Sequence, residues 1–272
     1  MPAARQTTRN KSTRAPRSLV AFERRGAISL LRLERPEKRN ALSDTMVQEL
    51  DARLGALPEG VKALVLHGAG RHFCAGLDLA ELAERSAAEG VAHSRMWHRI
   101  FDRIQFGSVP VVAVLHGAVV GGGLELASCA HVRVAESSAF YAFPEGQRGI
   151  FLGGGGSVRV PRLIGAHRVA DMMLTGRVLS AEEGHAAGIA SYLVRAGEGL
   201  AKGIELARRI ASNAPATNYA LMHALPRIAE LGQDAGLLME SLMAGIAQSE
   251  PEAKKRMRDF LEKRASKVKR RG

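Results

Sequence analysis

The sequence has few cysteines, few aromatic residues and no long apolar run. Its two cysteines, Cys74 and Cys129, are too few for a disulfide framework in a chain of 272 residues. No apolar segment approaches the roughly 18 residues that a membrane-spanning helix requires, and the N-terminus lacks the apolar core of a secretory signal. We therefore expect a cytoplasmic protein without a membrane span, in which both cysteines are small buried side chains.

Positive charge is abundant, but the excess lies at the two ends of the chain. The formal net charge is +12, of which residues 1–18 contribute +5 and residues 251–272 contribute +7, so the body is neutral. Residues 1–18 contain almost no apolar side chain and predict a disordered tail. A transit peptide would need an amphipathic pattern that this stretch lacks. We expect no nucleic-acid partner, because the tails carry no interleaved aromatic residues.

Strand-like apolar runs alternate with helical patterns up to residue 197, which predicts an α/β fold. The expected strands are Ala27–Leu33, Lys62–His67, Pro110–Leu115, His131–Ala135 and Ile189–Val194. Helical spacing occurs at 44–57 and 96–104, and Ser180 to Glu183 has the pattern of a capping box, with Gly188 at the expected helix end. After residue 197 we expect only helices, at 198–213, 215–230, 234–249 and 251–269. The chain thus divides into a tail (1–18), an α/β core (19–197) and a C-terminal helical region (198–272).

Three glycines, Gly121 to Gly123, follow the expected strand 110–115 and precede a helical segment. A glycine-lined turn lets a ligand oxygen approach the free N–H groups of the first helical turn. An anion or oxyanion site is one interpretation, and a tight turn that merely needs glycine is the other. Glu125 follows the triplet, where it either complements the helix dipole or acts as an acid or base beside the oxyanion site.

A second carboxyl group, Glu145, precedes another glycine cluster, and it is either catalytic or a solvated loop charge. Gly68-Ala69-Gly70 does not continue as a dinucleotide-binding fingerprint, because Phe73 stands where the third glycine is needed. The histidines show no metal-ligand spacing. We therefore expect neither a dinucleotide nor a metal, and we interpret His67, His72, His116 and His131 as structural residues.

The ordered series of motifs resembles the crotonase, or enoyl-CoA hydratase/isomerase, superfamily over residues 19–265. The motifs are Arg35-Pro36-Glu37-Lys38-Arg39-Asn40-Ala41-Leu42, the segment from Phe73 to Leu79, Gly121-Gly122-Gly123-Leu124-Glu125, Pro144-Glu145, Ser180-Ala181-Glu182-Glu183 and Phe260-Leu261-Glu262-Lys263-Arg264. The resemblance implies a spiral of ββα units with C-terminal helices that form a trimer, which often pairs into a hexamer. It also implies an acyl-CoA thioester substrate and no prosthetic group.

The resemblance assigns roles to individual residues. The backbone N–H groups of Leu77 and Gly122 would hold the thioester oxygen. The CoA moiety would lie near one set of residues from the core and a second set from the C-terminal helix, which could belong to a neighbouring subunit. The core set is Lys38, Arg39, Ala41, Ala75, Asp78 and Leu79, and the C-terminal set is Phe260 and Lys263.

Hydratases of this family carry glutamates at the positions of Glu125 and Glu145, so the resemblance implies syn addition of water to a trans-2-enoyl-CoA. Two alternatives remain open: an isomerase in which Glu145 alone is critical, and a non-catalytic protein that binds CoA or RNA. Gln147 and Arg148 depart from the usual apolar pattern after Glu145. If either faced the pocket, the substrate could carry an extra polar group or the reaction could be a different one.

Overall fold

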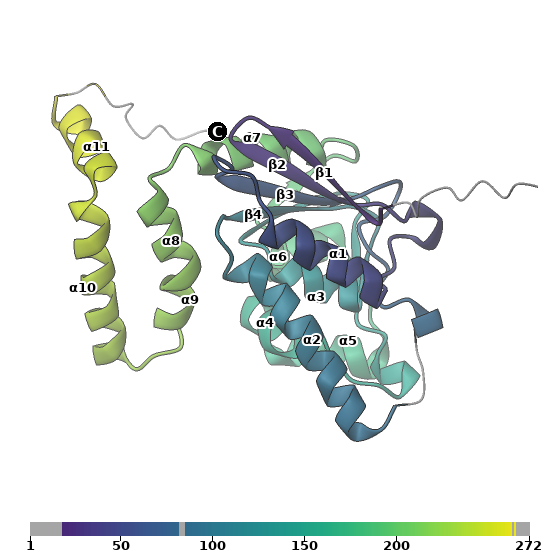
Figure 1. Cartoon of the computed structure of the whole chain (residues 1–272). Helices are drawn as coiled ribbons and strands as arrows, with labels where there is room; N and C mark the ends of the chain where they lie inside the picture. Colours follow the sequence, from purple (N-terminus) through teal and green to yellow (C-terminus); the bar gives the residue numbers. More distant parts are fainter. Residues whose placement is uncertain (1–17, 82–84, 263, 265–272) are drawn as a thin grey trace, which may run out of the picture.

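A computed structural model describes residues 18–81, 85–262 and 264 (Figure 1). Its main element is a six-stranded sheet in the order β1-β2-β3-β4-β6-β9. Only β1 and β2 pair antiparallel, and the other neighbours are parallel. The strands are β1 (Val20–Arg25), β2 (Ile28–Leu33), β3 (Ala63–Gly68), β4 (Val111–Leu115), β6 (Val132–Glu136) and β9 (Tyr192–Val194).

A second, three-stranded sheet has the order β5-β7-β8 and consists of β5 (Ala118–Val120), β7 (Phe140–Ala142) and β8 (Leu179–Ser180). The chain alternates between the sheets, because β4 is followed by β5 and β6 is followed by β7. Two successive turns of the resulting spiral thus contribute one strand to each sheet and then a helix. This arrangement brings loops from three successive turns to one place.

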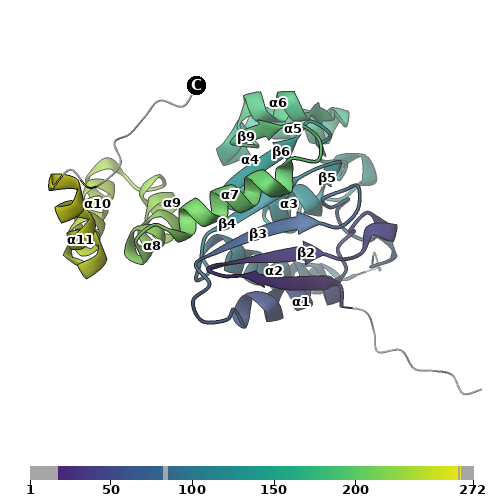
Figure 2. The same ribbon diagram turned by 90° about the horizontal axis from the view of Figure 1, so that it is seen from above.

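Helices cover both faces of the large sheet (Figures 1 and 2). On one face lie α1 (Asp44–Gly55), α2 (Ala87–Gln105), α3 (Gly122–Ser128) and the main hydrophobic core. Side-chain caps fix where two of them start: Ser43 accepts from the Met46 N–H, and Ser86 forms a capping box with Glu89. The spiral continues through α4 (Gly156–Ile164), α5 (Ala166–Thr175) and α6 (Ala181–Ala187).

Helix α7 (Gly199–Ala211) crosses the opposite face of the sheet and contacts β3 and β4 (Figure 2). Leu206, Ala207 and Ala211 form a second core with the valines and isoleucine of the strands. Close approach requires glycine in this helix, because a Cβ at Gly203 would lie 2.6 Å from a methyl carbon of Val114. With both faces covered, the parallel strands are buried along almost their whole length.

The C-terminal helices lie to one side of the core (Figure 1). They are α8 (Pro215–His223), α9 (Leu225–Ile228), α10 (Gln233–Ser249) and α11 (Pro251–Leu261). The single helix expected at 215–230 is wrong, because the chain breaks at Ala224, two residues before Pro226. The helix expected at 251–269 is also too long, since α11 ends at Leu261.

The predicted fold class is confirmed, and all five expected strands occur, although the last begins at Tyr192 rather than Ile189. Strands β1, β5, β7 and β8 were not predicted. The capping box at Ser180 and the left-handed Gly188 at the end of α6 are confirmed. Cys74 and Cys129 are buried, as expected, and both are free thiols. Over the described residues, no helix is long and apolar enough to cross a membrane. The tail at 1–17 and residues 265–272 lie outside the described part of the chain.

Candidate active site

The glycine triplet forms the turn between β5 and α3. Gly121 has φ +52°, a left-handed conformation that favours glycine, and its N–H donates to the Ala142 carbonyl at 2.9 Å. Gly122 is the first residue of α3, so its N–H lies at the positive end of the helix and lacks an intrahelical partner. The turn therefore presents one main-chain donor toward the space in front of the helix.

A second donor comes from Leu77, which lies in the loop after β3. The loop is fixed on both sides of this residue, because Leu42 N–H donates to Gly76 O at 2.7 Å and Asp78 N–H donates to Leu42 O at 2.8 Å. Among the residues that the structure describes, the N–H groups of Leu77 and Gly122 have no hydrogen-bond acceptor. A Cβ at Gly122 would lie 3.5 Å from Leu77 N. The two donors thus flank one small space that only a glycine leaves open.

Glu125 lies in α3 and is 4% exposed. Its Oε1 accepts from the N–H groups of Gly154 at 2.8 Å and Gly156 at 2.9 Å. Burial raises the pKa of Glu125, and these two N–H groups together with the Arg159 guanidinium oppose that rise. The carboxyl group is therefore held by main-chain donors on one oxygen. Its position is fixed by a loop that comes from a later turn of the spiral.

Glu145 follows β7 and is 8% exposed. Burial, reinforced by the charge of Glu125, raises the pKa of Glu145 to about 7. Its Oε2 is a buried atom without a hydrogen-bond partner in the described part of the chain. A Cβ at Gly121 would lie 2.5 Å from the other oxygen, Oε1, so glycine is required there for the carboxyl group to fit.

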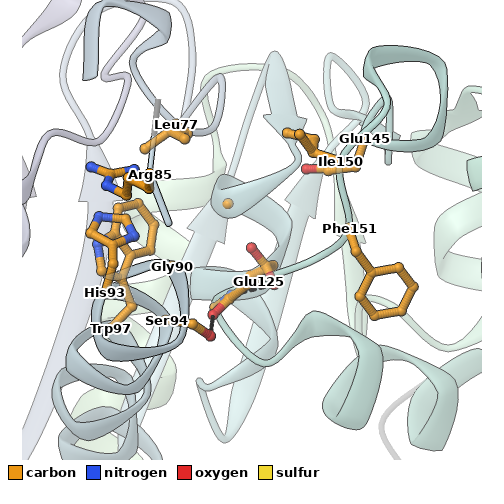
Figure 3. Close-up of a pocket in the computed structure, with 13 residues that line it drawn as sticks. Leu77, Arg85, Gly90, His93, Ser94, Trp97, Glu125, Glu145, Ile150 and Phe151 are labelled. Atoms are coloured by element: carbon orange, nitrogen blue, oxygen red, sulfur yellow. Dashed lines mark hydrogen bonds between the residues drawn. The ribbon is translucent and has the colours of Figure 1, made fainter. Parts of the chain in front are cut away.

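Both carboxyl groups and both N–H-bearing residues line one cavity of about 160 Å³ (Figure 3). Glu125 lies in the middle of the view, with Glu145 on the opposite side from Leu77. The remaining wall is partly apolar and partly polar. It is formed by Arg85, Gly90, His93, Ser94, Trp97, Ile150, Phe151, Gly153 and Gly154. The structure therefore brings together the four residues that the resemblance proposed for catalysis.

The loop that holds Glu125 is itself fixed by side chains. Ser94 Oγ donates to Gly153 O at 2.6 Å, and Arg159 Nη1 donates to Gly154 O at 3.2 Å. Arg159 also donates to Gln105 Oε1 at 2.6 Å and to Asp102 Oδ1 at 2.5 Å, so α2 anchors its guanidinium. Sequence reasoning missed this support, because Ser94, Asp102 and Gln105 lie more than 50 residues before the residues that they contact.

Three polar residues of the cavity, Arg85, His93 and Ser94, were also missed. His93 and Ser94 lie in the first turns of α2 and Arg85 lies just before it, whereas helical spacing indicated only the apolar stripe beginning at Met96. His93 Nε2 lies 2.7 Å from Asp44 Oδ1, and Trp97 Nε1 donates to the same oxygen at 3.0 Å. The available signal was one histidine and one arginine, His93 and Arg85, shortly before the predicted stripe.

Gln147 and Arg148 do not line the cavity. Gln147 Nε2 donates to Thr175 O at 3.4 Å, so its amide points toward the end of α5, and Arg148 is exposed. The unusual polar pair after Glu145 therefore does not reach the described cavity. The extra polar groups in that cavity come from α2 and from Arg85 just before it.

The core residues proposed for CoA binding lie around the Leu77 loop, whereas Phe260 lies apart from them on α11. Ala75 N–H donates to Arg39 O at 3.0 Å, which places the turn of Lys38 and Arg39 beside the Leu77 loop, and Ala41 is buried next to it. Asp78 is buried and forms a 2.6 Å ion pair with Arg35. Leu79 begins a short 3-10 helix. Phe260 is exposed on α11, whose helical contacts are with α10, and Lys263 lies outside the described residues.

The fold and the site define an enzyme built as an α/β spiral, whose cavity combines two main-chain N–H groups with two buried carboxyl groups. The chain belongs to the enoyl-CoA hydratase/isomerase family, whose family model matches residues 23–271. Family membership confirms the crotonase resemblance.

Individual relatives agree with this assignment. A short-chain-enoyl-CoA hydratase of Clostridium acetobutylicum is 32% identical over 90% of this chain and 95% of its own. The 2,3-dehydroadipyl-CoA hydratase of Escherichia coli is 30% identical over 91% of this chain and 97% of its own. A crystal structure of a candidate enoyl-CoA hydratase from Rhodopseudomonas palustris is 57% identical, covers 91% of this chain and 96% of its own, and has a TM-score of 0.89.

Proposed function

We propose that this protein hydrates trans-2-enoyl-CoA thioesters and that Leu77, Gly122, Glu125 and Glu145 perform the reaction. The observation that supports this assignment is the shared cavity, which brings together two buried carboxyl groups and two N–H groups that have no acceptor among the described residues. The N–H groups of Leu77 and Gly122 hold the thioester oxygen and stabilise the negative charge that develops on it during the reaction. Enoyl-CoA hydratase names among the relatives support the same chemistry.

The surroundings of the two carboxyl groups support a division of labour. The two N–H donors on Glu125 Oε1 oppose the rise that burial causes in the pKa of this group and stabilise its carboxylate, so Glu125 acts as the base. Glu145 Oε2 has no partner among the described residues, and its raised pKa keeps a proton available, so Glu145 acts as the acid.

The proposed reaction balances within this pair. A water between the carboxyl groups attacks C3 while Glu125 takes its proton, and the electrons of the double bond move onto the thioester oxygen. The enolate then collapses, and C2 receives the proton of Glu145. A proton then passes from Glu125 to Glu145, which restores both groups.

Loss of absorbance at the conjugated enoyl thioester band of crotonyl-CoA tests the proposal. The wild type should bleach the band, and Glu125→Gln and Glu145→Gln should each lower kcat by about 10²–10⁴-fold. Glu59→Gln, at an exposed position, is the matched control. An intact band with wild-type protein that still binds CoA would refute hydratase activity. Isomerisation of a 3-enoyl-CoA that survives Glu125→Gln but not Glu145→Gln would instead identify an isomerase.

We also propose that CoA lies along the turn of Lys38 and Arg39 and that the C-terminal helices join copies of the chain. Helix α10 supports the proposed association of copies, because each of three apolar residues on it is more than half exposed. These residues are Leu238, Leu242 and Ile246. Burying such side chains stabilises an association. Light scattering after gel filtration should give a mass near three times, or six times, the 29.1 kDa of one chain. A monomer would contradict this part of the proposal.

A further inference from the structure

The cavity that contains Glu125 and Glu145 also has a polar wall. Hydration of an enoyl-CoA with a simple alkyl chain does not use this wall. Arg85 and His93 lie next to each other on this wall, on the side of Leu77 and across the cavity from Glu145 and Ile150 (Figure 3). Hydration as proposed above needs only the main-chain donors and the two glutamates. The polar wall is therefore available to recognise the acyl group itself.

An apolar surface connects the oxyanion donors to this wall. A Cβ at Gly122 would lie 3.3 Å from Trp97 Cζ3, so the indole ring borders the thioester position. The ring centroids of Trp97 and His93 are 5.7 Å apart. The indole N–H donates to Asp44, so Trp97 offers the cavity an apolar ring rather than a donor. A short acyl chain that follows the ring from Gly122 arrives at His93 and Arg85.

The acidic groups near this wall already have partners or a raised pKa. Asp44 Oδ1 accepts from both His93 and Trp97. Glu125 Oε1 accepts from two glycine N–H groups, and the pKa of Glu145 is raised to about 7 by burial. Glu89, at the start of α2, is exposed and accepts from the Ser86 N–H and hydroxyl. A carboxylate that enters the cavity therefore meets anions whose charge is largely compensated.

The guanidinium of Arg85 has N–H donors available for a ligand. Arg85 is exposed, and one of its nitrogens, Nη2, donates to Glu81 O at 3.3 Å. A guanidinium has five N–H donors in a planar fork, so others remain for a ligand. This fork matches a carboxylate, with which it forms paired hydrogen bonds. Asp44 orients the His93 ring on the same wall.

From this geometry we infer that the preferred substrate is a short trans-2-enoyl-CoA whose acyl chain ends in a carboxylate, which Arg85 binds with His93 beside it. The inference rests on the proposed hydratase function and names the substrate class for it. It makes Arg85 a specificity-determining residue. Ser94 is excluded from this role, because its hydroxyl donates to Gly153 O.

Two substrates of equal length separate this inference from the function on which it rests. We would measure kcat/KM for trans-2-hexenoyl-CoA, which ends in a methyl group, and for the six-carbon trans-2-enoyl thioester that ends in a carboxylate. The wild type should favour the carboxylate. Arg85→Met should lower the ratio of the two values by about 10–100-fold, the usual effect of losing a hydrogen bond to a charged group, whereas Arg85→Lys should retain part of the preference. Arg99→Met, at an exposed arginine of α2 outside the cavity, should leave the ratio unchanged.

Three outcomes would overturn the inference. If the wild type hydrates both substrates without preferring the carboxylate, the inference is wrong and the hydratase function stands. If Arg85→Met lowers both values equally, Arg85 serves folding or general binding rather than recognition of the carboxylate. If the wild type hydrates neither thioester, both the inference and the proposed function fail.

Discussion

The backbone N–H of Gly156 donates to Oε1 of Glu125 at 2.9 Å, and a Cβ at Gly156 would lie 2.7 Å from Cγ of the same glutamate. The residue that positions the proposed base can therefore be nothing larger than glycine. Gly156 is the first residue of α4, which lies 31 positions after Glu125 in the chain. Packing between two turns of the spiral therefore fixes the position of the Glu125 carboxyl group.

Gly156→Ala should displace the Glu125 carboxyl group and lower kcat by about 10–100-fold, because general base catalysis depends on geometry. KM for the thioester should change less, since the oxyanion donors are elsewhere. Gly245→Ala is the control, because nothing lies within 4 Å of a Cβ at that helical position. An unchanged kcat in Gly156→Ala would contradict the role given to this contact.

Gly121→Ala should lower the activity more than a glycine-to-alanine change at other turns. The new methyl group would lie 2.5 Å from Glu145 Oε1, and φ at this position is +52°. We expect a fall of activity by at least about 10²-fold together with a lower melting temperature, because strain and displacement of the acid combine. Gly149→Ala, also left-handed at φ +70° but with nothing within 4 Å of its Cβ, separates strain from displacement. Equal activity in the two variants would contradict the prediction.

The raised pKa of Glu145, about 7, predicts how activity depends on pH. If Glu145 must be protonated, kcat/KM should fall as the pH rises above about 7. A pH profile of kcat/KM with crotonyl-CoA checks this. A flat profile between pH 6 and 9 would show that Glu145 is not the acid.

The same pKa predicts a stability effect with a definite sign. The folded carboxyl group holds its proton up to about pH 7, whereas the unfolded group releases it near 4.5, so the folded state binds more protons between these values. Stability should therefore fall as the pH rises from about 4.5 to 7, by up to about 3 kcal/mol, and then level off. Glu145→Gln should remove this contribution, so its gain in melting temperature over the wild type should be larger at pH 8 than at pH 5. A gain independent of pH would refute the assigned pKa.

Arg159 should act on the reaction through Glu125. Arg159→Met removes a donor to Gly154 O and a positive charge that lowers the pKa of Glu125. We expect a lower kcat and an acidic limb of the pH profile that moves to higher pH, because the base ionises less readily. Arg159→Lys, which keeps the positive charge, should move the acidic limb less than Arg159→Met does. Arg162→Met, which removes an exposed ion pair with Glu230, is the control. A loss of activity without movement of the limb would indicate a structural role only.

The sequence predicted five of the six strands of the large sheet, because parallel strands covered on both faces are continuous apolar runs, and it missed the antiparallel, largely exposed edge strand β1. It did not reveal β5, β7 and β8, which have only two or three residues each. Local pattern carries too little signal at that length. The break at Ala224 could have been predicted, since Pro226 was visible in the expected helix.

For the site, Glu125, Glu145, Leu77 and Gly122 could be named because they stand in short motifs. The supports of Glu125 could not, since Ser94 and Arg159 meet the glycine loop only after the spiral closes. Arg85 and His93 were missed for a related reason. Helical spacing shows which side chains share a face, and it does not show what that face encloses.

The two proposed oxyanion donors belong to the main chain, which has a consequence for how this enzyme can change. No side-chain replacement at Leu77 removes its N–H, whereas Arg85 and His93 recognise the acyl group through their side chains alone. Binding of the thioester and choice of the acyl group are therefore encoded separately. Point mutations in the first two turns of α2 and just before it can explore new substrates while the machinery that holds the carbonyl stays intact.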